Sequence, residues 1–181
     1  MEIRIVQATE TDAPFVARCV CLALHHELSE EEIPHVAAIC RRTDVLYSYR
    51  HALIAWVDGR PAGLCLCYDG ADYHEMRNIT FPLFSEGNEE MDLENAQDEA
   101  VSGEFYMDSL AVLPEYRRQG IGRMLMLAQI ERAKAAGFRK ATLLVDPDNP
   151  GAQSLYRSIG FNHQEDCYAF GQIFWKWYIN I

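Results

Sequence analysis

Long apolar runs are missing from this sequence. No stretch approaches the roughly 18 uninterrupted apolar residues that a membrane-spanning helix needs. The first residues, MEIRIVQATETDA, contain no apolar segment after a basic start, so they do not resemble a secretion signal. We therefore expect a cytoplasmic protein that has no membrane partner.

Basic residues are also scarce. Lys and Arg number 16 against 27 Asp and Glu, which gives a formal net charge of -11 at pH 7. Nucleic acid and anionic membranes both bind basic faces, so this balance argues against either as the main partner. It weakly favours a cationic partner instead.

The cysteines follow no disulfide or zinc-binding pattern. Four of the six form pairs separated by one residue and two stand alone: Cys19 and Cys21, Cys65 and Cys67, Cys40 and Cys167. The chain is not a short secreted one, and these spacings match no zinc framework. We expect reduced, packed thiols and no metal site.

Hydrophobic periodicity and turn residues predict one domain over residues 1–181. With 181 residues, of which 49% are apolar, the chain can bury a sizeable core. No internal repeat or linker is evident, so we expect an α+β domain built on a mixed sheet. The predicted order is a strand at 3–8, helices at 14–25 and 32–42, a hairpin of 51–57 with 62–68, a strand at 104–112, a helix ending near 136, a strand at 141–145, a helix at 152–158 and a strand at 173–181.

Residues 70–103 form an acidic insert with little periodicity. The insert contains the run EGNEEMDLENAQDE, and no Lys or Arg occurs between Arg77 and Arg117. This composition is typical of a solvated loop, either mobile or containing a short helix with a solvated face. A substrate-recognition element is the alternative.

Residues 117–125, RRQGIGRML, place three arginines and two glycines at the start of a predicted helix. Unpaired backbone N–H groups at the positive end of a helix dipole bind anions, and glycine lets an anion approach the backbone closely. Arginine adds charge-assisted hydrogen bonds to phosphate oxygens. The stretch therefore predicts a phosphate-binding loop.

Two common nucleotide loops do not match this spacing. A Rossmann fingerprint needs a small residue three positions after Gly122, where this chain has Leu125. A Walker loop needs Lys and then Ser or Thr after the glycine, but Arg123 and Met124 follow Gly122.

The pattern Arg117-x-x-Gly120-x-Gly122, after the strand SLAV and a proline turn, resembles the first motif of the GNAT family of N-acetyltransferases. In that family the loop binds the pyrophosphate of acetyl-CoA. The order of the N-terminal elements is also similar, so the resemblance covers nearly the whole chain except the insert. Matches to the second family motif are Asn149, Ala152, Leu155, Tyr156 and the run SIGF at 158–161.

The resemblance implies an α/β (α+β) GNAT fold: a central mixed, largely antiparallel twisted sheet of about seven strands, with splayed central strands and about four flanking helices. It also implies the contacts to acetyl-CoA. Strand 110–112 would pair its backbone with the pantetheine arm and aim an N–H at the thioester carbonyl. The implied binding residues are Leu110, Ala111, Val112, Arg117, Arg118, Gln119, Gly120, Ile121, Gly122, Arg123 and Asn149.

Some of these residues have a simpler alternative role. Arg117 and Arg118 are expected to face phosphate, but either could be a surface arginine lying along the loop. Asn149 could act only as a cap of the helix that follows it.

For catalysis, the resemblance implies direct transfer of the acetyl group to a primary amine. Tyr156 matches the family position of the general acid that protonates the departing thiolate; a core tyrosine is the alternative. Strand alternation puts Tyr106, Asp108 and Leu110 on one face, so Asp108 is the candidate base. A structural carboxylate is the alternative for Asp108.

Other groups could also reach the acceptor. Glu104 lies on the same predicted face as Asp108, and Glu75 and His74 lie in the insert. The choice between these groups and a bound water stays open. Asp146 and Asp148 are expected to shape the turn before Pro150.

The acceptor itself is not identified by any motif. A polyamine, an aminoglycoside-like amine or a basic peptide end would suit the acidic composition. The alternatives are a protein (N-terminal or lysine) acetyltransferase and a non-catalytic acyl-CoA sensor.

The last segment, Ile173–Ile181, alternates large apolar and polar residues, with Phe174 and Tyr178 on its second face. We expect a homodimer through this edge, with a helix covering the second face as the alternative.

Overall fold

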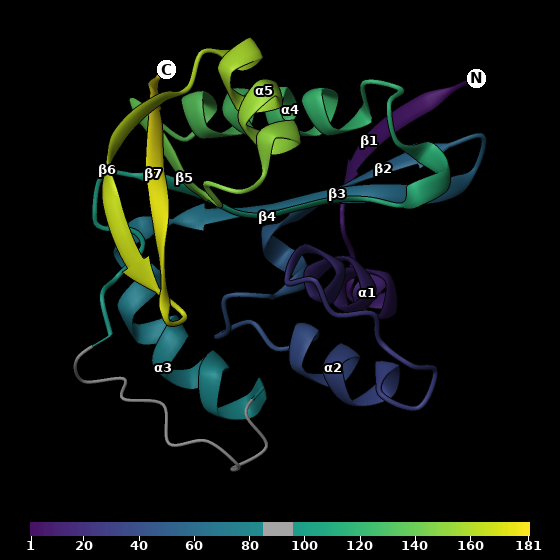
Figure 1. Ribbon diagram of the computed structural model, residues 1–181. Coiled ribbons are helices and arrows are strands. Elements are labelled where there is room, and N and C mark those ends of the chain that lie inside the picture. Colours follow the sequence, from purple (N-terminus) through teal and green to yellow (C-terminus); the bar gives the residue numbers. More distant parts are fainter. Residues whose placement is uncertain (85–95) are drawn as a thin grey trace.

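The computed structural model of the protein describes residues 1–84 and 96–181. Seven strands in this part of the chain are β1 Ile3–Gln7, β2 Ala52–Val57, β3 Arg60–Asp69, β4 Phe105–Val112, β5 Lys140–Val145, β6 Asn162–Ala169 and β7 Gln172–Asn180. They form one sheet in the order β1-β2-β3-β4-β5-β7-β6 (Figure 1). Only β4 and β5 pair in parallel, so the predicted mixed, largely antiparallel sheet is confirmed.

Helices cover both faces of the sheet. The described residues form α1 Ala13–Ala23, α2 Ile33–Cys40, α3 Tyr73–Phe84, α4 Ile121–Ala135 and α5 Pro150–Ile159. Helices α4 and α5 lie on one face, and α1, α2 and α3 lie on the other (Figure 1). In the part of the chain that is described, none of the helices has the length and apolar content needed to cross a membrane.

Each face of the sheet has its own apolar core. The α1–α3 core contains, among others, Val16, Val20, Ile54, Leu64, Leu66, Tyr68, Tyr73 and Tyr106. The α4–α5 core contains, among others, Cys65, Cys67, Met107, Leu125, Ile130, Leu143, Phe161 and Trp177, with Leu110 and Tyr156 packed against it. Residues on β3 and β4 therefore face one core or the other.

For residues 73–84 of the insert the preferred prediction of a loop is wrong, and the alternative of a short helix with a solvated face is confirmed. They form α3, which buries Tyr73, Met76 and Phe81 against the α1–α3 core. These three residues recur at helical spacing, but the polar residues between them and Pro82 weaken the pattern. Most of the acidic run falls on residues 85–95, outside the described residues.

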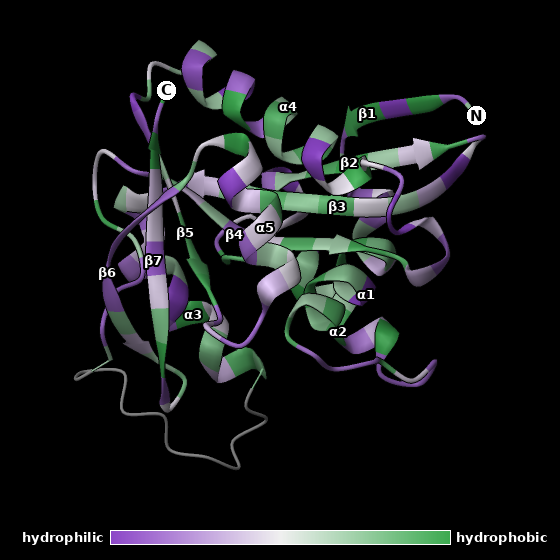
Figure 2. Ribbon diagram, turned by 45° about the horizontal axis from the view of Figure 1, so that its top comes forward, coloured by the Kyte–Doolittle hydropathy of each residue, from purple (hydrophilic) through white to green (hydrophobic). Residues whose placement is uncertain are grey.

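The C-terminal strand is predicted correctly, but its expected position at the sheet edge is wrong. Strand β7 pairs with both β5 and β6, so β6 is the edge. The sequence analysis does not predict β6, because only Cys167 is buried in this strand and its residues are mostly hydrophilic (Figure 2). A dimer that pairs along β7 would thus find that strand already paired.

Strands β4 and β5 pair over two positions only. Phe105 lies opposite Ala141 and Tyr106 lies opposite Thr142, and beyond these positions the two strands part. The predicted splay of the central strands is therefore confirmed. We call this opening between β4 and β5 the fork.

A β-bulge follows the closed end of the fork. The register between β3 and β4 shifts beside Asp108, which is left as an extra residue on β4. Tyr106 then faces the α1–α3 core, whereas Leu110 packs against the α4–α5 core. The expectation that Tyr106, Asp108 and Leu110 share one face is wrong for Leu110, because a bulge breaks the alternation of a strand.

An ion cluster holds the closed end of the fork. The Glu104 carboxylate accepts hydrogen bonds from Lys176 Nζ at 2.7 Å and Lys140 Nζ at 3.1 Å. It also accepts one from Thr142 Oγ1 at 3.3 Å. Glu104 and Lys176 are both buried, so these bonds join β4 to β5 and β7 where water is largely excluded.

We expect Glu104→Gln to lower the free energy of unfolding by about 3 kcal/mol, because it leaves a buried ammonium group without its counter-charge. Burial raises the pKa of Glu104, but hydrogen bonds from Lys176 and Lys140 outweigh burial and lower it. Because the pKa of Glu104 is lowered in the folded protein, its ionised carboxylate stabilises the fold above about pH 4.3, the pKa of glutamate in the unfolded chain. The difference in free energy of unfolding between variant and wild type should therefore shrink as the pH falls below that value.

Urea denaturation at pH 7 and at pH 3.5 measures both effects. Glu131→Gln is the matched control, since it removes an exposed carboxylate that pairs with Lys134 at 3.0 Å. An exposed pair contributes little, so its removal should change stability only slightly. Equal effects of the two substitutions would contradict the role of the ion cluster.

Candidate active site

The predicted phosphate loop lies between β4 and α4. Gly120 is the N-cap of α4 with φ 80°, and Arg118 has φ 62°. The left-handed backbone at Gly120 explains the glycine, since other residues are strained there. The first backbone N–H groups of α4 have no partner within the helix, as at any helix start, and such groups can bind an anion.

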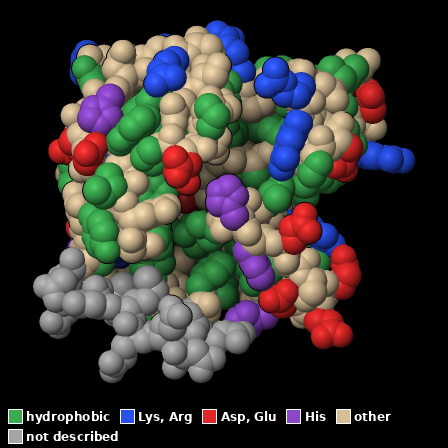
Figure 3. Space-filling model, viewed as in Figure 1, with side chains coloured by type: hydrophobic (Ala, Val, Ile, Leu, Met, Phe, Trp, Pro, Cys, Tyr) green, Lys and Arg blue, Asp and Glu red, His purple; other side chains and the backbone are tan. Residues whose placement is uncertain are grey.

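The loop arginines have different environments. Arg117 Nε donates to the Val112 carbonyl at 3.0 Å, which ties the loop to the end of β4. Arg118 and Arg123 are exposed. Lys and Arg side chains gather on the upper half of the face in Figure 3, which includes α5 and the region of the loop. This distribution suits a phosphate group better than the net charge of the whole chain would suggest.

Gly122 brings the first turn of α4 close to the fork. A Cβ atom at this position would lie 3.5 Å from Leu155, 3.7 Å from Val112 and 3.8 Å from Leu110. The loop, the end of β4 and α5 thus meet at one place. In Figure 3 the molecule is hollowed near the centre of the face, over the region where β4 and β5 part in Figure 1.

Tyr156 lies on α5 against the α4–α5 core. Its ring centroid is 6.2 Å from Phe161 and 6.4 Å from Trp177. Burial, and to a lesser degree the nearby Cys65 and Cys67, raise the pKa of Tyr156 well above its usual value, which keeps the phenol protonated. Within the described residues its hydroxyl forms no hydrogen bond, so it is available to donate one to a ligand.

Asn149 is the N-cap of α5. Its side-chain oxygen accepts a hydrogen bond from Ala152 N at 3.0 Å. The capping role that the sequence left as an alternative is therefore present. Its side-chain nitrogen takes no part in this cap, so it can donate a hydrogen bond to a cofactor.

Asp108 lies on the bulge of β4, on the side of the α1–α3 core. It accepts a short hydrogen bond from the Tyr68 hydroxyl and one of 2.7 Å from Ser109 Oγ. Burial raises the pKa of Asp108, although both hydrogen bonds oppose this effect. A carboxylate with a raised pKa, held in one orientation, can accept a proton.

Glu99 is a buried carboxylate on the α1–α3 side that no sequence pattern singles out. Its carboxylate accepts a hydrogen bond of 2.8 Å from the Tyr73 hydroxyl and a shorter one from the Tyr106 hydroxyl. Burial, with the charge of Asp108 as second cause, raises its pKa to about 7. In the sequence Glu99 ends an acidic run, where no pattern separates a buried carboxylate from its solvated neighbours.

The other candidate bases are placed differently. Glu104 is bound by two lysines, so it is a structural carboxylate. His74 is exposed and pairs with Asp98 at 3.0 Å, and Glu75 is exposed on α3. None of these three contacts Asp108 in the described structure.

Asp146 accepts a hydrogen bond from Asp148 N at 2.8 Å. The prediction that this stretch shapes the turn before Pro150 is therefore confirmed.

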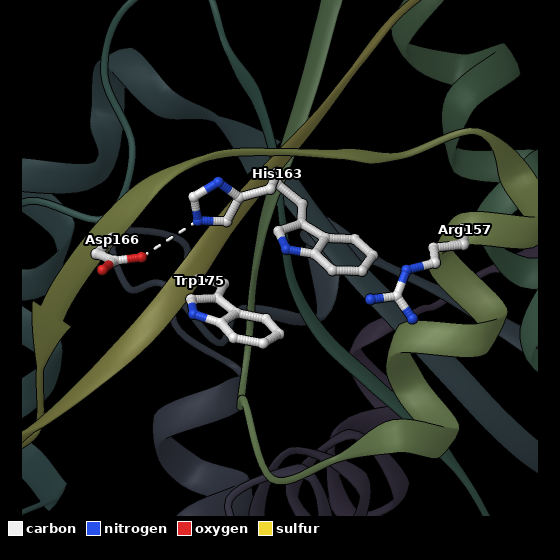
Figure 4. A pocket seen from close by; sticks show the side chains of 5 residues that line it. Arg157, His163, Asp166 and Trp175 are labelled. Carbon is white, nitrogen blue, oxygen red and sulfur yellow. Dashed lines mark hydrogen bonds and ion pairs between the residues drawn. The ribbon is translucent and has the colours of Figure 1, made fainter.

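A separate open pocket lies beside α5. Its volume is about 430 Å³, and its walls include Arg157, His163, Asp166 and Trp175 (Figure 4). His163 Nε2 lies 3.2 Å from Asp166 Oδ1, so these two polar side chains of the pocket wall pair with each other. None of the residues predicted for the active site lines this pocket.

The cysteines and acidic residues suggest no metal centre. All six cysteines are buried and unpaired. Among the residues that the structure describes, no three His, Cys, Asp or Glu side chains are grouped as metal ligands.

Known proteins share both the sequence motifs and the fold. A sequence profile described as the Acetyltransferase (GNAT) family matches residues 21–161. A crystal structure described as an acetyltransferase is 29% identical, with a TM-score of 0.78 over 98% of each chain.

Two curated relatives match more locally. Mycothiol acetyltransferase of Gordonia bronchialis is 28% identical over 118 residues, which are 65% of this chain and 33% of that protein. The [ribosomal protein bS18]-alanine N-acetyltransferase of Escherichia coli is 38% identical over 64 residues, which are 35% of this chain and 43% of that protein. The matches thus span less than half of each relative.

The family profile covers most of the chain, and the sheet, the fork and the loop before α4 agree with it. The protein therefore belongs to the acetyltransferase (GNAT) family.

Proposed function

We propose that the protein transfers the acetyl group of acetyl-CoA directly to a primary amine, with both substrates bound together. One observation carries this proposal. Tyr156 lies on the α4–α5 side of the fork, with the phosphate loop, whereas Asp108 bonds to Tyr68 on the opposite side. A proton donor and a proton acceptor therefore approach the fork from opposite faces of the sheet.

Acetyl-CoA would enter from the α4–α5 side. The N–H groups of Ile121, Gly122 and Arg123 support its pyrophosphate, because they start a helix and point away from the helix body. The unpaired edge of β4 at residues 110–112 is open to the pantetheine arm, since β5 has already parted from β4 there. A β4 N–H would then stabilise the oxyanion of the thioester carbonyl.

The acceptor amine would approach from the α1–α3 side. Asp108 removes a proton from the ammonium group, and the neutral amine nitrogen attacks the thioester carbon. The C–N bond forms and the C–S bond breaks. Tyr156, which is protonated at neutral pH, donates its proton to the departing thiolate, and the nitrogen then loses its second proton, through water, to the Tyr156 phenolate as the amide forms. Asp108 passes the first proton to water, so the products are an amide, the free thiol of CoA and one proton.

The acceptor is proposed to be cationic. Asp108 and Glu99 both place carboxylates on the α1–α3 side of the fork, and the chain has a net charge of -11. A second candidate, the N-terminal amine of a protein, is favoured by the local match to the bS18-alanine acetyltransferase.

The first test follows CoA release by chromatography, because thiol dyes would also label the protein's cysteines. Acetyl-CoA is supplied with polyamines, amino acids, aminoglycosides or basic peptides, and acetyl-CoA binding is titrated in parallel. Release with one amine class supports the proposal and names the acceptor type. Binding without release on any of these amines would contradict a small cationic acceptor, and would leave a protein acceptor or a non-catalytic acyl-CoA sensor.

Tyr156→Phe should lower kcat by about 100-fold or more, which is the usual contribution of a general acid. Affinity for acetyl-CoA should stay within about twofold, because the ring and its packing remain. Tyr178→Phe is the control, since Tyr178 is a half-buried tyrosine on β7 that is not assigned to the reaction. Unchanged turnover in Tyr156→Phe would remove Tyr156 from the mechanism.

Gly122→Val should weaken acetyl-CoA binding by about tenfold or more, because its side chain would project toward Leu110, Val112 and Leu155. Isothermal titration measures the change. Ala135→Val is the matched control: it also adds a branched side chain on α4, but at an exposed position in the last turn, at the opposite end of the helix from the loop. Equal affinities of the two variants would show that the cofactor lies elsewhere.

A further inference from the structure

Two carboxylates share the α1–α3 side of the fork, Glu99 buried and Asp108 half-buried. Asp108 is bonded to Tyr68, and Glu99 is bonded to Tyr106 and Tyr73. The centroids of the Tyr68 and Tyr106 rings are 5.7 Å apart with edge-on geometry. The tyrosine that binds Asp108 therefore packs against a tyrosine that binds Glu99. Glu99 is 7% exposed and Tyr106 is 2% exposed, which excludes most water from the space they share.

Neither carboxylate is neutralised by a basic side chain. In the described parts of the chain, the ion pairs include neither Asp108 nor Glu99. Lys176 is near enough to lower the pKa of Glu99 slightly, but its ammonium group is 2.7 Å from Glu104. All the hydrogen-bond donors to Asp108 and Glu99 are therefore hydroxyl groups, and the two like charges act on each other through a dry, weakly polarisable region.

We propose that Glu99 is a positioning residue for the reaction, whose carboxylate, once ionised, makes Asp108 across the tyrosine cluster a stronger proton acceptor for the amine. The inference rests on the proposed role of Asp108. Tyr73 and Tyr106 hold the Glu99 carboxylate from both oxygens, so its charge cannot turn away from Asp108. Glu99 itself need not touch either substrate.

The two carboxylates should titrate as one unit. When two carboxylates in one low-polarity region interact, the first proton leaves at low pH and the second is retained to a higher pH, because its loss creates a second anion there. Burial and the charge of Asp108 raise the pKa of Glu99 to about 7. The fully ionised, active pair would form as pH rises through about 7, close to the pH at which a general base works best.

Other titratable groups also face this pair. The pKa values of Cys67 on β3, Tyr47 before β2 and Cys167 on β6 are all raised, chiefly by burial. The charge of Asp108 adds to this effect at Cys67 and Tyr47. The charge of Glu99 adds to it at Tyr47 and Cys167. His51, whose ring packs against Tyr68, has a pKa lowered by burial. All four are neutral above pH 7, so none of them supplies the missing positive charge.

The test is the pH dependence of kcat/KM, measured from pH 5 to 9 with the best amine acceptor. Glu99→Gln should move the midpoint of the acidic limb down by about one pH unit or more, since Asp108 then ionises without a neighbouring anion. The maximal kcat should fall several-fold, because a less basic carboxylate is a poorer proton acceptor. A purely structural role would lower kcat/KM by the same factor at every pH, without moving the midpoint.

Matched variants separate this inference from the proposed function. Glu99→Asp keeps the charge and should restore the wild-type midpoint, whereas Glu165→Gln removes an exposed carboxylate on β6 and should leave the whole profile unchanged. Asp108→Asn should abolish the acidic limb and most of the activity. Full activity in Asp108→Asn would overturn the proposed base, whereas loss there with an unmoved midpoint in Glu99→Gln would overturn only the role of Glu99.

A measurement on the wild-type protein covers the case in which Glu99→Gln fails to fold. The carboxyl carbons of Asp108 and Glu99 can be followed by ¹³C NMR as pH is varied. Coupling predicts that both signals move in two shared steps. Two independent single-step curves would overturn the inference.

Discussion

The short contact between β4 and β5 is the constraint on which the rest of the structure depends. Two residue pairs join these strands before they part, and such a contact alone is too small to hold two halves of a sheet together. The buried carboxylate of Glu104 compensates, since it binds lysines from β5 and β7 at the closed end. A pair of charges in a dry place is costly to form but more costly to break, so it suits a joint that must keep one geometry. The open end of the fork can then remain unpaired without the sheet separating.

The open fork divides the chemistry between two faces of one sheet. On the α4–α5 side, a helix start and its glycines offer backbone N–H groups to an anion, and Gln129 on α4 fixes the helix by bonding to the Cys65 carbonyl at 2.6 Å. On the α1–α3 side, the bulge at Asp108 turns a carboxylate toward a cluster of tyrosines. In the proposed reaction each substrate would therefore meet surroundings suited to its own charge, and the two would meet only where the strands part.

The insert illustrates how composition can hide a function. Its first part forms α3, which supplies Tyr73 to the α1–α3 core, and its last part supplies Glu99. Tyr106 on β4 links both residues to the surroundings of Asp108. Its hydroxyl donates to Glu99, and its ring packs against those of Tyr73 and Tyr68. Among the described carboxylates of the segment, Glu75 is exposed, whereas Glu99 is enclosed by aromatic rings.

The sequence by itself determined what depends on local order. Alternation and helical spacing predicted six of the seven strands and four of the five helices, and the RRQGIGRML stretch identified the loop because positive φ and a helix start are properties of neighbouring residues. The tertiary structure alone decided which distant residues meet. It placed β6 at the edge, broke the alternation at Asp108 by a bulge set by pairing with β3, and brought Glu99 to Tyr73 and Tyr106. Such contacts join residues whose separation along the chain leaves no periodic trace, so no local pattern could report them.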